Sequence, residues 1–146
     1  MSSDKVKHIE LVEAIIERMA RNSFQLKGWA ITLISLISVF ATTEISNGWR
    51  FVVFGILLIP AISFWYLDAF YLSLERKYRI LYARVLEDKI PPFCLDLKEI
   101  EYSHDEEKKT KLSCCVKAQC NLWFYGSLAS VILIFMIISV VYYLQH

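Results

Sequence analysis

Two charged side chains lie at the ends of apolar stretches, where an ionisable group needs a partner and can serve a function. Lys27 precedes the apolar stretch that begins at Gly28, and Asp68 lies near the end of the apolar stretch Phe51–Phe70. A charge close to hydrocarbon is costly unless a partner of opposite sign reduces that cost. If the two stretches run antiparallel, both residues fall at nearly the same depth, and we expect them to pair. Such a pair acts either as a gate on an ion pathway or as a tie that fixes the register of two helices.

A stripe of small and hydroxyl-bearing residues follows Lys27 along the first apolar stretch. Its members are Gly28, Thr32, Ser35, Ser38 and Thr42. Steps of three or four residues place all of them on one face of a helix. Small residues allow close approach between helices in a membrane, and hydroxyls bond across such a contact. The stripe therefore lines a pore or polar cavity, or it forms a helix contact in which the hydroxyls also bond back to their own helix.

The remaining reactive side chains do not form a recognisable catalytic set. The four cysteines are Cys94, Cys114, Cys115 and Cys120. Two adjacent cysteines followed by a five-residue step are not a standard zinc spacing, so we favour incidental reduced thiols over zinc binding or lipidation and expect no metal. No phosphate-binding glycine loop, dinucleotide fingerprint, HExxH or GxSxG motif is present. We therefore expect no catalytic residue, no cofactor and no enzymatic activity.

Three apolar blocks of the chain are expected to position Lys27, Asp68 and the polar stripe. They lie at about 28–43, 51–70 and 122–144 of a 146-residue chain that is 56 % hydrophobic. Since a helix needs roughly 20 apolar residues to cross a bilayer, each block is a candidate span. The sequence predicts an all-α integral membrane protein with three transmembrane helices. The whole chain, 1–146, is then a single membrane domain.

Basic residues are distributed unevenly around the three spans. Of the 16 lysines and arginines, five precede or open the first span, one lies between the first two, ten lie between the second and third, and none follows the third. Because basic residues favour the cytoplasmic side, we expect the N-terminus inside and the C-terminus outside the cell membrane, in bacteria the inner membrane. The basicity of the long loop is then explained by topology. Acidic residues dilute the charge of this loop, and its aromatic residues do not interleave with basic ones in a way that argues for nucleic acid, so we expect no nucleic-acid partner.

Two long helices of similar length are predicted at 4–43 and 51–89. They are joined by a short turn at Glu44–Arg50, so they form an antiparallel hairpin, and each would be roughly 60 Å long. About half of this hairpin would extend into the cytoplasm, where Glu75 could pair with Arg18 or Arg21. A cytoplasmic loop at 90–120 and a third span at 122–144 follow, with Trp123 and Tyr125 marking the inner interface.

Two motifs resemble a widespread group of small bacterial membrane proteins. The first is the run from Arg21 to Trp29, which reads RNSFQLKGW. The second is FWYLD from Phe64 to Asp68, followed by Tyr71-Leu72, Glu75-Arg76, Arg79 and Leu81-Tyr82. The resemblance covers roughly 15–85. Some members of the group are associated with defence genes, so the resemblance implies a membrane effector or accessory subunit in antiviral (antiphage) defence.

These observations lead to one expected function and one alternative. A three-span bundle has little interior and its polar stripe needs a partner, so we expect a homo-oligomer in the lipid bilayer. The expected function is an oligomeric membrane effector that forms or gates a pore or perturbs the membrane in response to a cytoplasmic protein partner or signal. The alternative is a non-conducting anchor or scaffold subunit that holds a cytoplasmic partner at the membrane.

Overall fold

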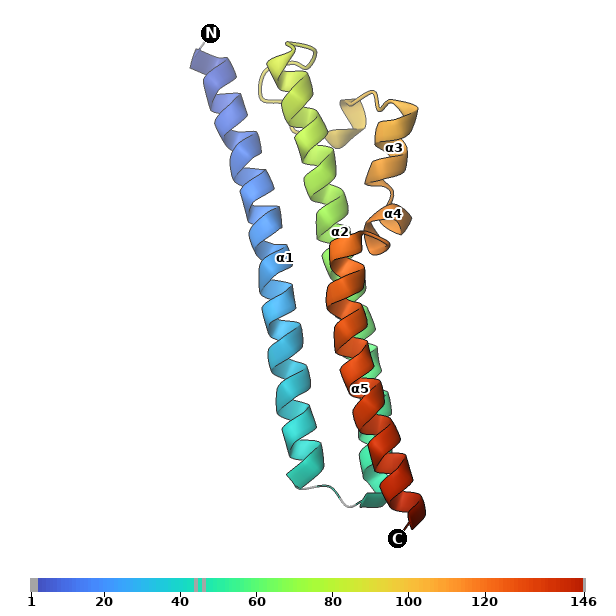
Figure 1. The fold of residues 1–146 in the computed structure, drawn as a ribbon. Helices are drawn as coiled ribbons and strands as arrows, with labels where there is room; N and C mark the ends of the chain where they lie inside the picture. Colours follow the sequence, from blue (N-terminus) through green and yellow to red (C-terminus); the bar gives the residue numbers. More distant parts are fainter. Residues whose placement is uncertain (1–2, 44, 46, 146) are drawn as a thin grey trace. The chain divides into compact units, whose positions relative to one another are not determined.

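The computed structural model describes residues 3–43, 45 and 47–145, and these residues form helices and connecting loops without a strand (Figure 1). The long helices are α1 (Ser3–Thr43), α2 (Asn47–Leu86) and α5 (Gln119–Gln145). A 3₁₀ turn, η1 (Leu97–Glu99), and two short helices, α3 (His104–Thr110) and α4 (Leu112–Val116), lie between α2 and α5. Each long helix is long and apolar enough to cross a membrane, which suggests a membrane location for the chain.

The chain divides into two compact units. The first unit comprises 1–24 and 69–117, and the second comprises 25–68 and 118–146. Helices α1 and α2 each contribute one half to each unit, whereas α5 belongs to the second unit. The first unit carries most of the charged residues, and the second carries the three apolar blocks.

The second unit is built around an apolar core to which α1, α2 and α5 all contribute. Its buried members are Ile34, Ala41, Phe54, Leu57, Ala61 and Ile132. Phe54 stacks on Phe135 with ring centroids 5.6 Å apart. Lipid removes the hydrophobic drive for helices to associate, so close packing of this kind, together with polar contacts, holds membrane helices together.

The first unit has a separate core, in which the N-terminal half of α1 meets the C-terminal half of α2. Its buried members are Val12, Leu81, Val85 and Ile100. Ile9, Ile16 and Tyr78 pack against it. Ile9 and Ile16 lie three residues before and four after Val12 on one face of α1, and Tyr78 lies three residues before Leu81 on α2. At its edge, the Tyr82 hydroxyl donates a 3.0 Å hydrogen bond to Glu13.

Helix α2 ends at Leu86 and not at Lys89, so the predicted end is wrong. The Lys89 N–H donates to the Arg84 carbonyl and the Asp88 N–H to the Val85 carbonyl, the two bonds of a Schellman motif. Asp88 adopts the left-handed conformation that this motif requires, with φ 56°. Lys5 completes the cap, because its ammonium group donates to the Leu86 carbonyl (3.0 Å) and pairs with Asp88 (2.7 Å).

The predicted turn at 44–50 is shorter than expected, because α2 already begins at Asn47; Glu44 and Ser46 lie outside the described residues. Arg50 donates from Nη2 to the Thr42 carbonyl (2.8 Å) and from Nε to the Ile45 carbonyl (2.9 Å). These bonds satisfy acceptors at the end of α1 that the helix itself leaves unpaired. At the other end of the second unit, α5 begins at Gln119, slightly before the predicted 122.

Candidate functional site

Lys27 of α1 and Asp68 of α2 form an ion pair inside the second unit. The Lys27 ammonium group donates a hydrogen bond to Oδ2 of Asp68. The Asp68 side chain is 0 % exposed and that of Lys27 is 19 % exposed. In such surroundings the attraction between opposite charges is much stronger than in water, and the loss of either partner leaves a costly unpaired charge.

Aromatic rings surround this pair. The Lys27 ammonium nitrogen lies 5.9 Å from the centroid of the Phe124 ring, within the range of a cation–π contact. Tyr125 stacks on Trp65 with centroids 6.3 Å apart and meets Phe124 edge-on at 4.9 Å. All three helices of the second unit therefore contribute to the site, and its rings limit the access of water to the charges.

The Tyr125 hydroxyl adds an unused donor beside the carboxylate. It is close enough to Asp68 to interact with it electrostatically. This hydroxyl and the amide nitrogen of Asn121 have no hydrogen-bond partner among the described residues, although both are buried. Lys27 is therefore bonded to Asp68, and the Tyr125 hydroxyl lies close to the same carboxylate.

The role of Tyr125 differs from the sequence prediction. The sequence predicts both Trp123 and Tyr125 at the membrane interface. Trp123 is 73 % exposed, whereas Tyr125 is only 3 % exposed and packs inside the second unit. The buried residues of α5 are Asn121, Tyr125 and Ile132, at steps of four and seven. These three residues share one face of α5, but the helix is apolar on every side, so its sequence carries no periodic signal that separates Tyr125 from Trp123.

The polar stripe of α1 does not face the core of the second unit. Gly28, Thr32, Ser35 and Thr42 are exposed and Ser38 is half-buried. The buried face of the same stretch carries Ala30, Ile34 and Ala41. The Thr32 hydroxyl donates to the Gly28 carbonyl (2.9 Å) and that of Thr42 to the Val39 carbonyl (2.8 Å). A Cβ atom added to Gly28 would meet nothing within 4 Å.

The second predicted contact, between Glu75 and Arg18 or Arg21, is not formed, so this prediction is wrong. Glu75 instead accepts hydrogen bonds of 2.9 and 2.7 Å from Arg79, one turn along its own helix. Arg21 approaches Glu17 at 3.8 Å, also one turn away. Pairs four residues apart on one helix need little ordering of the side chains, and here they prevail over a contact between helices.

The cysteines are spread through the two units. Cys115 is buried, Cys94 is half-buried, and Cys114 and Cys120 are exposed. Within the described ranges, no group of three or more histidine, cysteine or carboxylate side chains is placed to hold a metal ion.

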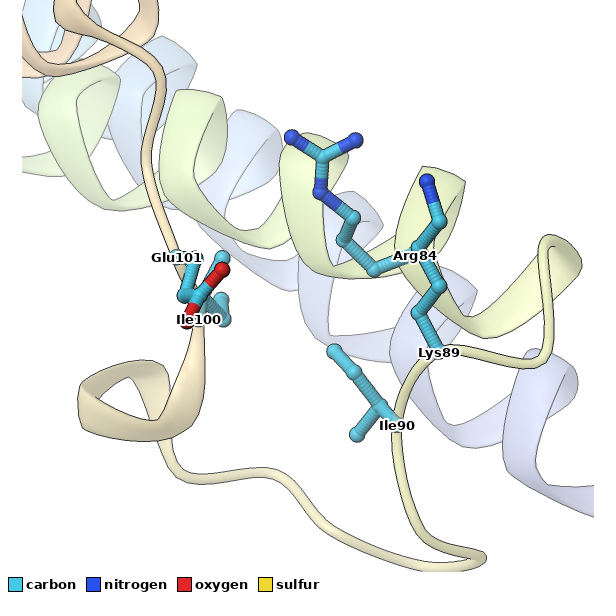
Figure 2. A pocket seen from close by; sticks show the side chains of 5 residues that line it. All are labelled: Arg84, Lys89, Ile90, Ile100 and Glu101. Atoms are coloured by element: carbon cyan, nitrogen blue, oxygen red, sulfur yellow. The ribbon is translucent and has the colours of Figure 1, made fainter.

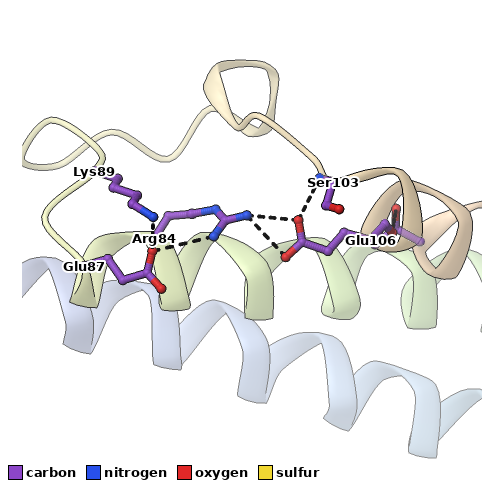
Figure 3. Close-up of polar contacts among 6 residues, drawn as sticks. Arg84, Glu87, Lys89, Ser103 and Glu106 are labelled. Carbon is purple, nitrogen blue, oxygen red and sulfur yellow. Dashed lines mark hydrogen bonds and ion pairs between the residues drawn. The ribbon is translucent and has the colours of Figure 1, made fainter.

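A cavity of about 510 Å³ opens in the first unit, lined by Arg84, Lys89, Ile90, Ile100 and Glu101 (Figure 2). Its two cations are engaged with carboxylates. Arg84 contacts Glu106 at 3.0 Å and Glu87 at 3.6 Å, and Lys89 contacts Glu87 at 2.7 Å (Figure 3). The bond from Lys89 and the charges of Lys89 and Arg84 lower the pKa of Glu87. Because Glu101 adds a further negative charge, this cavity does not attract anions.

Protein-family models, curated proteins and solved structures give no match to this chain.

Proposed function

We propose that this chain assembles in the membrane into a homo-oligomer that forms or gates a pore or perturbs the bilayer. In this proposal the N-terminus and the first unit lie in the cytoplasm, where they receive a protein partner or signal, and the C-terminus lies outside. The resemblance of the RNSFQLKGW and FWYLD motifs to defence-associated membrane proteins suggests antiphage defence as the setting.

The observation that carries the proposal is the unpartnered polar stripe of α1. Gly28, Thr32 and Ser35 are exposed, while the opposite face of the helix is buried in the core of the second unit. Lipid offers hydroxyl groups no hydrogen-bond partner and offers glycine no close contact. A second copy of the chain offers both, and several copies around an axis would bring their stripes together at a lumen.

The buried ion pair supplies a gate in this proposal. Asp68 is bonded to Lys27 and lies beside the unused hydroxyl of Tyr125. A movement of α1 that withdraws Lys27 leaves the carboxylate with a substitute donor on α5. The exchange of partners lowers the cost of opening, since an unpaired buried charge is otherwise very unfavourable.

One observation favours a non-conducting anchor instead. The hydroxyls of Thr32 and Thr42 already bond to carbonyls of their own helix. Hydroxyls satisfied in this way need no water, so the stripe can serve as a dry contact between copies without lining a lumen. In that case the oligomer would hold a cytoplasmic partner at the membrane.

The stripe is tested by enlarging Gly28. A Cβ at Gly28 meets no atom of its own chain, so Gly28→Leu should leave the monomer folded but prevent close approach of a second copy. Leu36→Ala, at an exposed position on the same stretch, is the matched control. Native mass spectrometry in detergent measures the oligomer, and liposomes loaded with a small dye measure leakage.

We expect the unmodified chain and Leu36→Ala to form the same oligomer and to release dye, and Gly28→Leu to do neither. If the chain forms an oligomer but liposomes that contain it release neither dye nor ions under activating conditions, the pore hypothesis is rejected and the anchor hypothesis is supported. A monomeric unmodified chain, or an unchanged oligomer of Gly28→Leu, rejects the role of the stripe in both functions.

A further inference from the structure

A second cavity in the first unit, of about 500 Å³, has a different charge balance from the first. Arg76, Arg79, Ile80, Glu106, Lys109 and Thr110 line it. They come from α2 and α3, so the cavity lies where the short helix packs against the long one. Its volume is within the usual range for pockets that hold small ligands or ligand headgroups.

The single carboxylate among these lining residues is already occupied. Glu106 accepts hydrogen bonds of 3.0 and 3.3 Å from Arg84 and one of 2.9 Å from the Ser103 N–H (Figure 3). Arg79 in turn is paired with Glu75 at 2.7 Å. Arg76 and Lys109 have no carboxylate partner among the residues that the structure describes, so the cavity has an excess of positive charge.

Arg76 is held in place by contacts that do not neutralise it. Its Nη1 donates to the Lys109 carbonyl at 2.7 Å and lies 3.9 Å from the Cys114 sulfur. The Ser73 hydroxyl donates to the Thr110 carbonyl at 2.6 Å and ties α3 to the same stretch of α2. A guanidinium group fixed through one nitrogen keeps other N–H groups for an anion that accepts two parallel hydrogen bonds, and two oxygens of a phosphate fit this geometry.

The position of the cavity along α2 favours the phosphate of a lipid headgroup as its ligand. Arg76 follows the apolar stretch Phe51–Phe70 by six residues, or about 9 Å of helix. The headgroup layer of each leaflet is roughly 5–8 Å thick, and the long side chains of arginine and lysine bend back towards it. Ile80 adds an apolar wall suited to the glycerol end of a lipid.

We propose that Arg76 and Lys109 form a binding site for the phosphate headgroup of an anionic phospholipid. Basic pockets beside membrane-spanning helices suit such headgroups, because each cation near the surface adds to the attraction. The site does not depend on oligomerisation or conductance. A bound headgroup would hold α3 at the membrane surface. Because Glu106 of α3 is bonded to Arg84, the end of α2 would be held there too.

The test uses the full chain in detergent, freed of co-purified lipid. Native mass spectrometry measures the binding of phosphatidylglycerol, of zwitterionic phosphatidylcholine and of soluble glycerol 1-phosphate. The double variant Arg76→Gln/Lys109→Gln is compared with Lys108→Gln/Lys111→Gln, which removes the same total charge but leaves the cavity lining intact. Lys109→Gln alone is included because no hydrogen bond or ion pair of its side chain with other described residues is lost.

We expect the Arg76/Lys109 double variant to bind phosphatidylglycerol roughly 10- to 30-fold more weakly and the Lys108/Lys111 control to change by less than about threefold. Lys109→Gln should weaken binding by about fivefold. Equal losses in the two double variants, equal binding of phosphatidylcholine, or undiminished binding by Lys109→Gln would overturn the site. Binding of glycerol 1-phosphate as tight as that of the lipid would reject the lipid as its ligand.

Discussion

The ammonium group of Lys27 donates a hydrogen bond to the carboxylate of Asp68, and that carboxylate is wholly buried. The pair joins α1 to α2 at the end of the second unit where Phe124 and Tyr125 of α5 also pack. Removing one partner of such a pair costs more than the pair itself contributes, because the other charge stays buried without its counter-ion.

We predict that Asp68→Asn and Lys27→Gln will each lower the free energy of unfolding by about 3–5 kcal/mol. The double variant Lys27→Gln/Asp68→Asn should lose clearly less than the sum, since no unpaired charge remains. Unfolding in detergent, followed by circular dichroism, measures all three. Arg21→Gln, which removes an exposed cation from a pair on one helix, is the control and should cost about 0.5 kcal/mol or less. Strictly additive losses in the cycle would contradict the coupling.

His8 of α1 fastens the loop that follows α2. Its Nδ1 accepts a hydrogen bond from the Phe93 N–H at 3.3 Å, so Nε2 carries the proton and donates to the Cys94 carbonyl at 2.9 Å. The imidazole ring also stacks on Phe93, whose φ of 63° is uncommon for a bulky residue. The loop keeps this conformation because the buried His8 side chain satisfies its backbone.

We predict that His8→Phe will lower the free energy of unfolding by about 1–3 kcal/mol, because the ring contact can persist while two backbone groups lose their partner. Amide hydrogen exchange at Phe93 should rise. His104→Phe changes an exposed histidine at the start of α3 and should leave both measurements within about 0.5 kcal/mol of the unmodified chain. Unchanged protection at Phe93 in His8→Phe would show that the loop does not depend on the imidazole.

Arg84 connects the end of α2 to α3. Its guanidinium group bonds to both carboxylate oxygens of Glu106, and its side chain is half-buried. Lys111 makes a similar-looking pair with Glu107 at 3.2 Å, but both side chains are exposed. Water and salt screen exposed pairs, so the two contacts should differ in strength although their distances are alike.

We predict that Arg84→Gln will cost about 1.5–3 kcal/mol and will speed hydrogen exchange throughout 104–110. Lys111→Gln should cost about 0.5 kcal/mol or less and leave that exchange unchanged. Mass spectrometry of peptides from both variants gives the comparison. If the two substitutions have the same effect, Arg84 does not hold α3 in place.

Much of the fold could be predicted from the sequence because lipid imposes strict conditions. A span needs an uninterrupted apolar block, and the three blocks correspond to the three candidate membrane-crossing helices. A charge near hydrocarbon needs a partner at its own depth, which limited the choice for Asp68 to Lys27. Few alternatives satisfy such conditions, so composition and spacing were sufficient.

Other contacts depend on geometry that composition does not carry. Glu75 had acceptable partners on two helices, and the one on its own helix prevailed. The end of α2 at Leu86 rests on the left-handed conformation of Asp88, a residue type that adopts it only occasionally. The clamp of His8 on Phe93 joins residues 85 positions apart in the chain, and no spacing rule connects them.

Cys114 and Cys115 are adjacent in sequence but differ in their surroundings. Cys114 is exposed, whereas Cys115 is 0 % exposed, and its thiol lies 3.8 Å from the Lys109 carbonyl oxygen. Burial raises the pKa of the Cys115 thiol, and the nearby Arg76 and Lys77 only partly offset this. Since the thiolate is the reactive form, both access and ionisation protect Cys115.

We predict that iodoacetamide at pH 8 will modify Cys114 at least about tenfold faster than Cys115. Fragmentation of the shared peptide in a mass spectrometer assigns the two rates, and Cys114→Ser should abolish the fast one. The pKa of the Cys115 thiol is higher in the folded state than its unfolded value of 9.0. This difference stabilises the folded state at pH values below 9.0, and the stabilisation is lost as the pH rises above that value. Modification of Cys115 should therefore accelerate as the pH rises above 9, where the thiolate begins to form. Equal rates at pH 8 would contradict the burial of Cys115.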